Sequence, residues 1–390
     1  MSLLTDRIDR AKQTHTRLVM HQPPKLRDRV KMLDIPGRAG LLVGPRGTGK
    51  TTWLIRHCDE HHLLYVSADH PMIADVPLYD LLEAAFNLGY EGAVIDEVHH
   101  SVDWSKHLKA AYDSFPNKRL IASDSSAVVI RAGTADLSRR FPIHTLPLLS
   151  FREYLMLRQD CSVPVIDPFD FNLADVQAIL RDLNVMRYFQ DYLKAGFRPF
   201  FLESEQLYID KVMNVLTKSM EGDIPFLVSR LTESHLRLMN SVIGYLATSS
   251  VPTIQINSLC SEWHIGKETL YELLEAMQRA HLIRIVRKQN DHKVHSVGAK
   301  MFLHEPSVYK NFSNNPGTMR EAYVAAAFIE AGKTVYAAVK EVDSDFMVDG
   351  YQLEVGGSKK KRKSAAYVIR DDTDVPYGQS LPMWLLGFQY

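Results

Sequence analysis

The segment that most constrains this chain is the loop sequence Gly44-Pro45-Arg46-Gly47-Thr48-Gly49-Lys50-Thr51. It fits the pattern G-x-x-x-x-G-K-[ST] along its whole length, and it directly follows the apolar run Leu41 to Val43. In this pattern the glycines let backbone N–H groups curl around phosphate oxygens, while the N-terminus of the next helix adds partial positive charge. The segment therefore predicts a buried parallel strand, a phosphate-binding loop (P-loop) and a helix, in that order.

The residue types of this loop predict how ATP and Mg²⁺ would be held. Lys50 is long enough to reach the β- and γ-phosphates, and the hydroxyl of Thr51 is a ligand for Mg²⁺. We expect the nucleotide to contact the loop and the first turn of the helix, which comprise Gly44, Pro45, Arg46, Gly47, Thr48, Gly49, Lys50, Thr51 and Thr52.

A second part of such a site follows about 45 residues along the chain, where the apolar run Ala93 to Ile95 ends in Asp96 and Glu97. Acids at the end of a buried strand near a P-loop are placed to hold the metal and to polarise water. We expect Asp96 to hold Mg²⁺ and Glu97 to activate the attacking water.

The pattern of short apolar runs and amphipathic stretches predicts the fold class. Strand-like and helical segments alternate from about residue 41 to residue 122, as in an α/β domain with a parallel sheet and helices on both faces. From about residue 150 to residue 250 the sequence pattern predicts helices, and near residues 282–287 and 335–348 it again predicts β-structure. A chain of 390 residues with 46% hydrophobic residues can build several such domains.

Several segments together resemble a family of prokaryotic AAA-type ATPases. They are GPRGTGKTT, VIDEVHH followed by Trp104, the polar strand end Ala122 to Ser126, and Leu137 to Arg140 before LPLLSFREYL. In that family the ATPase core is followed by a helical lid, a winged helix and a restriction-endonuclease-like domain. The resemblance implies N-terminal helices in 1–36, an ATPase core in 37–150, a lid in 151–245, a winged helix in 246–300 and a degenerate nuclease-like domain in 301–390.

The same resemblance implies further catalytic residues. Ser123 and Ser125 match polar residues that sense the γ-phosphate or the attacking water. Arg140 matches an arginine that could act on nucleotide bound to a neighbouring copy, although Arg139 stands where the family more often has glycine. An arginine acting in trans would make hydrolysis depend on assembly, so a homo-oligomer is expected.

Two segments are candidates for contact with double-stranded DNA. The order helix, Gly266 turn, helix and β-ribbon over residues 251–297 is typical of a winged helix, and Lys267 stands at the start of its second helix. Glu268, Glu272 and Glu275 on that helix favour docking of a protein instead. The second candidate is a run of five cations, which is equally compatible with a solvated loop: Lys359, Lys360, Lys361, Arg362 and Lys363.

Three acids in the C-terminal part resemble the metal-binding acids of restriction-type nucleases. They are Glu321 on a predicted helix, Asp345, and Glu354 on a predicted strand. Gly356 occupies the place of the lysine in the E-x-K pattern, so we expect a nuclease fold without nuclease activity, unless Lys359, Lys360 or Lys361 supplies the charge.

Composition excludes some classes of protein and leaves others open. The 46 Lys and Arg balance the 46 Asp and Glu, which excludes a uniformly basic nucleic-acid binder. Three scattered cysteines favour a reducing cytoplasm, and we find no signal peptide or membrane-spanning run. His57 and His61 are spaced i, i+4 but lack the H-E-x-x-H order, so we expect no metal there.

The sequence thus predicts a cytoplasmic, Mg²⁺-dependent ATPase whose nucleotide state is coupled to DNA or a partner. Two alternatives stay open: a slow nucleotide-gated switch or scaffold without a DNA role, and an ATP-regulated nuclease.

Overall fold

The computed structural model of the chain describes residues 3–125, 137, 139–228, 231–249, 256–289, 299–313, 315–339, 344–357 and 366–390. The chain divides into two compact units, Met1–Pro147 and Leu148–Tyr390. No helix among these described residues is long and apolar enough to cross a membrane.

The first unit is built on a five-stranded parallel sheet in the order β2-β3-β4-β1-β5. This sheet confirms the α/β class predicted from the alternating pattern. Its strands are β1 (Ala39–Val43), β2 (Leu64–Ser67), β3 (Gly92–Asp96), β4 (Arg119–Asp124) and β5 (Ile143–Thr145). All five residues of β1 and of β3 are buried, as expected for inner strands covered on both faces.

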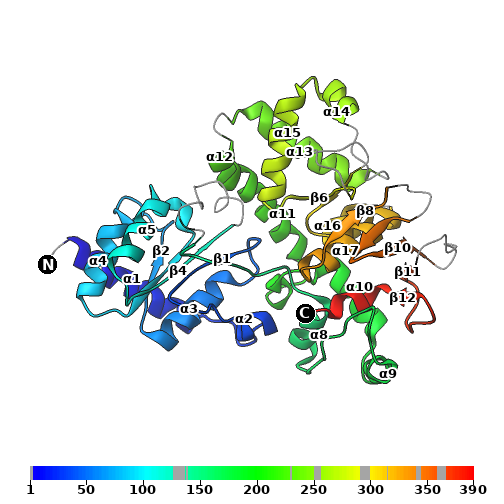
Figure 1. Cartoon of the computed structure of the whole chain (residues 1–390), viewed down its shortest axis with the longest axis horizontal. Helices are drawn as coiled ribbons and strands as arrows, with labels where there is room; N and C mark the ends of the chain where they lie inside the picture. The colour runs from blue at the N-terminus through cyan, green and yellow to red at the C-terminus, as the bar shows by residue number, and fades with distance from the viewer. Residues whose placement is uncertain are drawn as a thin grey trace. The chain divides into compact units, whose positions relative to one another are not determined.

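Helices cover both faces of this sheet (Figure 1). They are α1 (Leu3–Met20), α2 (Asp28–Met32), α3 (Lys50–His61), α4 (Leu78–Asn87), η1 (Val98–His100) and α5 (Trp104–Ser114). Alternate strand residues point to opposite faces. Leu41 and Leu120 therefore pack with α1, α4 and α5 in one apolar cluster, while Leu42 and Ile121 pack with α2 and α3 in another.

The strand order brings chemically important residues to one edge of the sheet. β4 lies between β1 and β3, and Val43 at the end of β1 is in register with Asp124 at the end of β4. Ile95 of β3 is in register with Ala122 of β4, so the carboxyl ends of all three strands meet. Ligands of open parallel sheets bind at this edge.

The second unit begins with the helical block predicted after residue 150. Its helices are α8 (Phe151–Gln159), α9 (Leu173–Asp182), α10 (Val185–Ala195), η2 (Pro199–Leu202), α11 (Tyr208–Lys218), η3 (Ser219–Asp223), α12 (Ile224–Leu227) and α13 (Glu233–Thr248). A capping box stabilises the start of α8, because the Ser150 hydroxyl accepts a hydrogen bond from the Glu153 N–H and the Glu153 carboxylate accepts one from the Ser150 N–H.

The rest of the second unit combines helices with two sheets. α14 (Ile256–Trp263) and α15 (Lys267–Arg279) precede an antiparallel pair, β6 (Ile283–Val286) and β7 (Lys300–Leu303). The last segment consists of α16 (Ser307–Phe312), α17 (Pro316–Glu330), β8 (Val335–Ala337), β9 (Phe346–Val348), β10 (Tyr351–Gly356), β11 (Tyr367–Arg370), β12 (Ser380–Pro382) and η4 (Met383–Phe388). Its five strands form one mixed sheet in the order β12-β11-β10-β9-β8.

Candidate nucleotide-binding site

The P-loop connects β1 to α3 in a conformation that its glycines make possible. Gly44, Gly47 and Gly49 have φ angles of 150°, 73° and 104°, a region that L-residues with side chains rarely adopt. A Cβ on Gly44 would lie 2.2 Å from the Leu146 carbonyl oxygen, so the backbone there also needs the space. The glycines identified in the sequence therefore shape the loop.

Arg27, a buried residue that the sequence did not mark as functional, contacts the backbone of the P-loop. Arg27 is 3% exposed, and its Nη1 donates to the carbonyl oxygens of Thr48 at 3.0 Å and Pro147 at 2.7 Å. The Thr48 hydroxyl donates to the Pro45 carbonyl at 2.9 Å. Nothing in the local sequence around Arg27 marks it, because its partners lie 21 and 120 residues away.

Lys50 begins α3, and its ammonium lies against the loop. Its Nζ donates to the carbonyl oxygens of Gly44 at 2.8 Å and Pro45 at 3.1 Å. Burial lowers the pKa of Lys50, and the nearby carboxylates of Glu97 and Asp96 oppose that shift. Phosphate oxygens at this loop would compensate the buried ammonium strongly.

Asp96 is the centre of a hydroxyl cluster at the sheet edge. Its Oδ2 accepts hydrogen bonds from Thr51 Oγ1 at 2.7 Å and from Tyr65 Oη at 3.1 Å, and Ser123 Oγ donates to Oδ1. Burial raises the pKa of Asp96, although the Ser123 and Thr51 hydroxyls act against the rise. This all-oxygen donor set fits Mg²⁺, whose charge would offset the buried carboxylate.

Glu97 follows β3 in a left-handed backbone conformation, with φ at 50°. Its Oε1 accepts a hydrogen bond from Arg46 Nη1 at 3.2 Å, and its Oε2 lies 3.8 Å from His99 Nδ1. Its N–H donates to Ser123 Oγ at 3.4 Å. The two acids predicted for catalysis thus lie beside the P-loop, and Ser123 contacts both.

Behind Glu97 lies a buried His–Asp pair. His99 Nδ1 is 2.9 Å from Asp124 Oδ1, and the His99 N–H donates to Asp124 Oδ2 at 3.1 Å. Asp124 is fully buried, and the Ser125 hydroxyl lies 3.4 Å from its Oδ1. The sequence marks Ser125 as a nucleotide sensor through the family resemblance, while the structure shows this contact with Asp124.

The two arginines proposed to act in trans lie just before β5. Arg140 forms a two-pronged ion pair with Asp113 of α5, through Nε at 2.8 Å and Nη2 at 3.0 Å. Arg139 is exposed. A role for Arg140 on the nucleotide of another copy therefore requires this ion pair to open.

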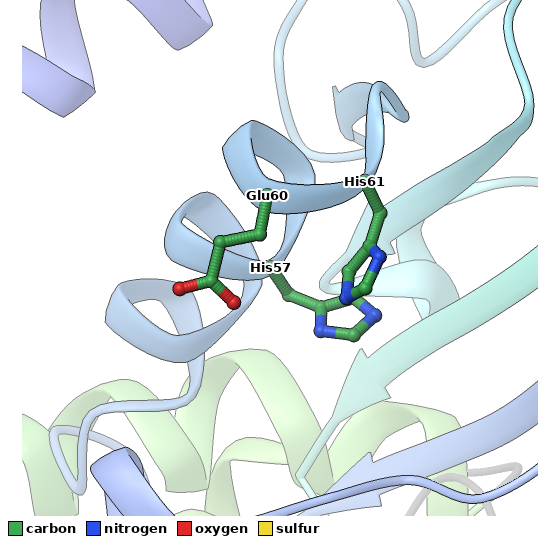
Figure 2. Close-up of side chains that lie close together, drawn as sticks. All are labelled: His57, Glu60 and His61. Carbon is green, nitrogen blue, oxygen red and sulfur yellow. The ribbon is translucent and has the colours of Figure 1, made fainter.

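Among the described residues, two groups of side chains are close enough to share a metal ion, with their ligand atoms within 4.8 Å of one another. One group is Glu97, His99 and His100, beside the P-loop. The other lies on α3 and is formed by His57, Glu60 and His61, whose two imidazole rings face one another in Figure 2.

Other contacts account for the group on α3 without an ion. The His57 ring stacks on Trp53 at a centroid distance of 4.6 Å, and Glu60 Oε1 pairs with Arg56 Nε at 3.0 Å. Burial, aided by the positive charge of Arg119, lowers the pKa of His57 to about 4. His57 is therefore a packed core residue.

The acids of the C-terminal part meet a lysine that the sequence did not suggest. Lys300 of β7 places its Nζ 2.6 Å from Glu321 Oε2 and 3.5 Å from Asp345 Oδ1. Asp345 Oδ2 also accepts a hydrogen bond from the Val355 N–H at 2.8 Å. Glu354 is fully buried in β10. The ammonium of Lys300 therefore lies between two of the three predicted metal ligands.

The predicted DNA contacts are only partly described. Lys267 is exposed at the first position of α15. The cation run formed by Lys359, Lys360, Lys361, Arg362 and Lys363 lies outside the described residues.

The comparison with family models agrees with the fold of the first unit. Residues 37–155 match the family model of an AAA domain. No curated protein matches the chain in sequence. RuvB of Thermotoga maritima is 16% identical with a TM-score of 0.30, over 72% of this chain and 88% of RuvB. The ORC2 protein of Aeropyrum pernix is 14% identical with a TM-score of 0.28, over 74% and 95% of the two chains.

Three observations support the same fold. They are the parallel sheet with β4 between β1 and β3, the P-loop after β1, and the match of residues 37–155 to an AAA domain. The chain therefore contains an α/β core with the fold of an AAA P-loop ATPase.

Proposed function

We propose that the first unit binds ATP with Mg²⁺ and hydrolyses the bond between the β- and γ-phosphates. The observation that carries this proposal is the 2.7 Å hydrogen bond between Thr51 and Asp96, because it joins the P-loop helix to the acidic strand end. In this proposal, one edge of the sheet carries every group that the reaction needs. These groups are the P-loop, the Lys50 ammonium, the oxygens of Thr51 and Asp96 for the metal, and Glu97 as the base.

Each residue has a role in this reaction. The loop N–H groups and Lys50 bind the phosphates, and Thr51 and Asp96 hold Mg²⁺, which neutralises charge on the phosphate oxygens. Glu97 accepts the proton of the water that attacks the γ-phosphorus, and the bond to the leaving β-phosphate oxygen breaks to give ADP and phosphate. Ser123 orients the Asp96 carboxylate and accepts a hydrogen bond from the backbone N–H of Glu97.

Phosphate release measured across a range of ATP concentrations tests this proposal. We expect Mg²⁺-dependent turnover by the natural protein, and a loss of about 100-fold or more in ATP affinity for Lys50→Ala, since a charge-assisted contact contributes about 2 to 3 kcal/mol. Asp96→Asn should raise the Mg²⁺ concentration that gives half-maximal rate. Turnover that persists unchanged in both variants, or in excess chelator, would rule out this site.

We also propose that the second unit couples the nucleotide state to DNA or to a partner protein. The helix pair α14 and α15 followed by the ribbon of β6 and β7 has the order of a winged helix, and the exposed Lys267 begins α15. ATPase rates with and without double-stranded DNA, across protein concentrations, test both the coupling and the expected homo-oligomer. Unchanged rates with nucleotide-dependent assembly would favour the switch or scaffold instead.

Nuclease activity is not part of this proposal. Lys300 forms ion pairs with Glu321 at 2.6 Å and Asp345 at 3.5 Å, so two predicted metal ligands already share one cation. We expect no cleavage of plasmid or linear DNA in Mg²⁺ or Mn²⁺. Cleavage that Asp345→Ala abolishes would support the ATP-regulated nuclease.

A further inference from the structure

The third residue of the P-loop holds the proposed catalytic base. Arg46 Nη1 donates to Glu97 Oε1 at 3.2 Å, and the two side chains are only 10% and 18% exposed. The contact joins two loops that are 51 residues apart in the sequence. Because both groups are charged and largely shielded from water, this pair is stronger than an ordinary surface ion pair.

The pair engages the carboxylate on which hydrolysis depends. Glu97 Oε1 faces the guanidinium of Arg46, and Oε2 faces the imidazole of His99 at 3.8 Å. Lys50 and Asp96 also face this group, because both lie at the same sheet edge. The guanidinium engages Oε1 and fixes the orientation of the carboxylate, so Glu97 cannot turn towards a water in the nucleotide site while Arg46 holds it.

A γ-phosphate bound at this loop would compete with Glu97 for the same arginine. The backbone of the P-loop wraps the phosphates, so a side chain on its third residue starts next to them. A guanidinium binds phosphate oxygens in two-pronged geometry at least as well as it binds a carboxylate. ADP has no γ-phosphate, so it offers Arg46 no such alternative to Glu97.

We propose that Arg46 is the residue by which this site distinguishes ATP from ADP. On ATP binding it leaves Glu97 for the γ-phosphate, and Glu97 is thereby freed to accept the proton of the attacking water. With ADP the Arg46–Glu97 pair persists. This proposal rests on the proposed ATPase function and adds a condition to it: the base becomes available only when the substrate is in place.

A double-mutant cycle on nucleotide affinity tests the exchange of partners. The probes are a non-hydrolysable ATP analogue and ADP, each with Mg²⁺, titrated into the full chain and its Arg46→Gln, Glu97→Gln and doubly substituted variants. We expect Arg46→Gln to weaken the analogue about 10- to 100-fold and ADP less than about 3-fold, as expected for one lost charge-assisted contact. Arg46→Lys should restore part of the affinity for the analogue.

Glu97→Gln gives the decisive comparison. It should tighten the analogue several-fold when Arg46 is present, because Arg46 no longer has to leave a carboxylate, and clearly less when Arg46 is replaced. If Arg46 stays on Glu97 in all states, the two substitutions act independently and their effects add. Additive effects, or an equal loss for ADP and the analogue in Arg46→Gln, would overturn the proposal.

A matched control lies on α3, the helix that follows the P-loop. Arg56 pairs with Glu60 at 3.0 Å, with side chains 47% and 53% exposed and away from the loop. Arg56→Gln should leave both affinities unchanged. A natural protein that binds neither probe would refute the ATPase proposal itself, whereas normal binding with additive effects would refute only the role of Arg46.

Discussion

Asp96 illustrates how single residues build this site from distant parts of the chain. Its carboxylate accepts hydrogen bonds from Thr51, Tyr65 and Ser123, which come from α3, β2 and β4. Local motifs predicted Thr51 and Asp96, and the family resemblance indicated Ser123. Tyr65 could not be predicted, because its role depends only on β2 lying next to β3.

At Gly44 the loop conformation allows a direct test at the scale of one residue. Gly44→Ala would place a Cβ 2.2 Å from the Leu146 carbonyl oxygen at a φ of 150°, so the backbone must shift. We expect a loss of about 2 kcal/mol or more in the free energy of unfolding, together with weaker nucleotide binding. Urea unfolding and a nucleotide titration measure the two effects.

Gly37 provides the control for this prediction. Its φ is 83°, but a Cβ there would meet no atom within 4 Å. Gly37→Ala should therefore cost only the strain of its backbone conformation, about 1 kcal/mol, and leave nucleotide affinity unchanged. Equal losses in the two variants would show that close packing at Gly44 is unimportant.

At the scale of elements, the short apolar runs predicted the parallel strands well because inner strands are buried on both faces. β5 was not predicted, since Ile143–Thr145 has only three residues and its outer two are exposed. β5 forms because it pairs in parallel with β1, with Ile143 in register with Leu41. β12 escaped prediction for a similar reason, as it has only three residues.

On α3 the buried imidazole of His57 predicts a pH dependence of stability. Its folded pKa is lowered to about 4 from an ordinary value of 6.5, so the unfolded chain takes up the proton first as the pH falls. His57 stabilises the fold fully above about pH 6.5, and its contribution is lost progressively towards pH 4. The loss is up to about 3 kcal/mol.

Denaturant unfolding of the natural protein and His57→Gln across this pH range measures the effect. The difference in stability between the two should shrink as the pH falls from 6.5 to 4. If the free energy of unfolding of His57→Gln depended on pH as it does in the natural protein, the His57 imidazole would have to be solvated or protonated in the fold.

A buried ion pair links helical elements of the second unit. Arg198 and Glu305 are 1% and 2% exposed and pair directly, and Tyr208 Oη donates to Glu305 Oε1 at 2.7 Å. Glu305→Gln leaves the Arg198 charge buried without its carboxylate, which should destabilise this unit by about 3 to 5 kcal/mol. Urea unfolding followed by circular dichroism measures the loss.

The exposed pair Arg158 and Glu205 is a control with the same chemistry. Its atoms are 2.7 Å apart, but the side chains are 42% and 45% exposed. Glu205→Gln should cost less than about 1 kcal/mol. A similarly small loss in Glu305→Gln would contradict the interpretation of the buried pair as a structural link.

At the scale of the whole molecule, the division into units Met1–Pro147 and Leu148–Tyr390 separates the nucleotide site from the helical and mixed-sheet part. Composition gave only the expectation of several domains, because the net charge of zero carries no information about where function lies. The P-loop and the acidic strand end both lie in the first unit, where we propose the nucleotide site, and the roles of the second unit are also proposals.

Calorimetry can show whether nucleotide acts on the first unit alone. A ligand at 100 times its Kd stabilises the unit that binds it by about 2.7 kcal/mol, which raises the Tm of a unit of this size by roughly 10 °C. We expect Mg²⁺ and a non-hydrolysable ATP analogue to shift one of two transitions and to leave the other in place. A shift of neither transition would contradict nucleotide binding by the first unit.

The most direct test of the central claim is the identity of the nucleotide that stays on the protein after incubation with Mg²⁺ and ATP. The bound fraction is separated, denatured and resolved by chromatography at successive times. We predict that the natural protein converts bound ATP to ADP, that Glu97→Gln retains uncleaved ATP with a rate at least about 100-fold lower, and that Lys50→Ala retains little nucleotide. Conversion of ATP by Glu97→Gln at the natural rate would contradict the account.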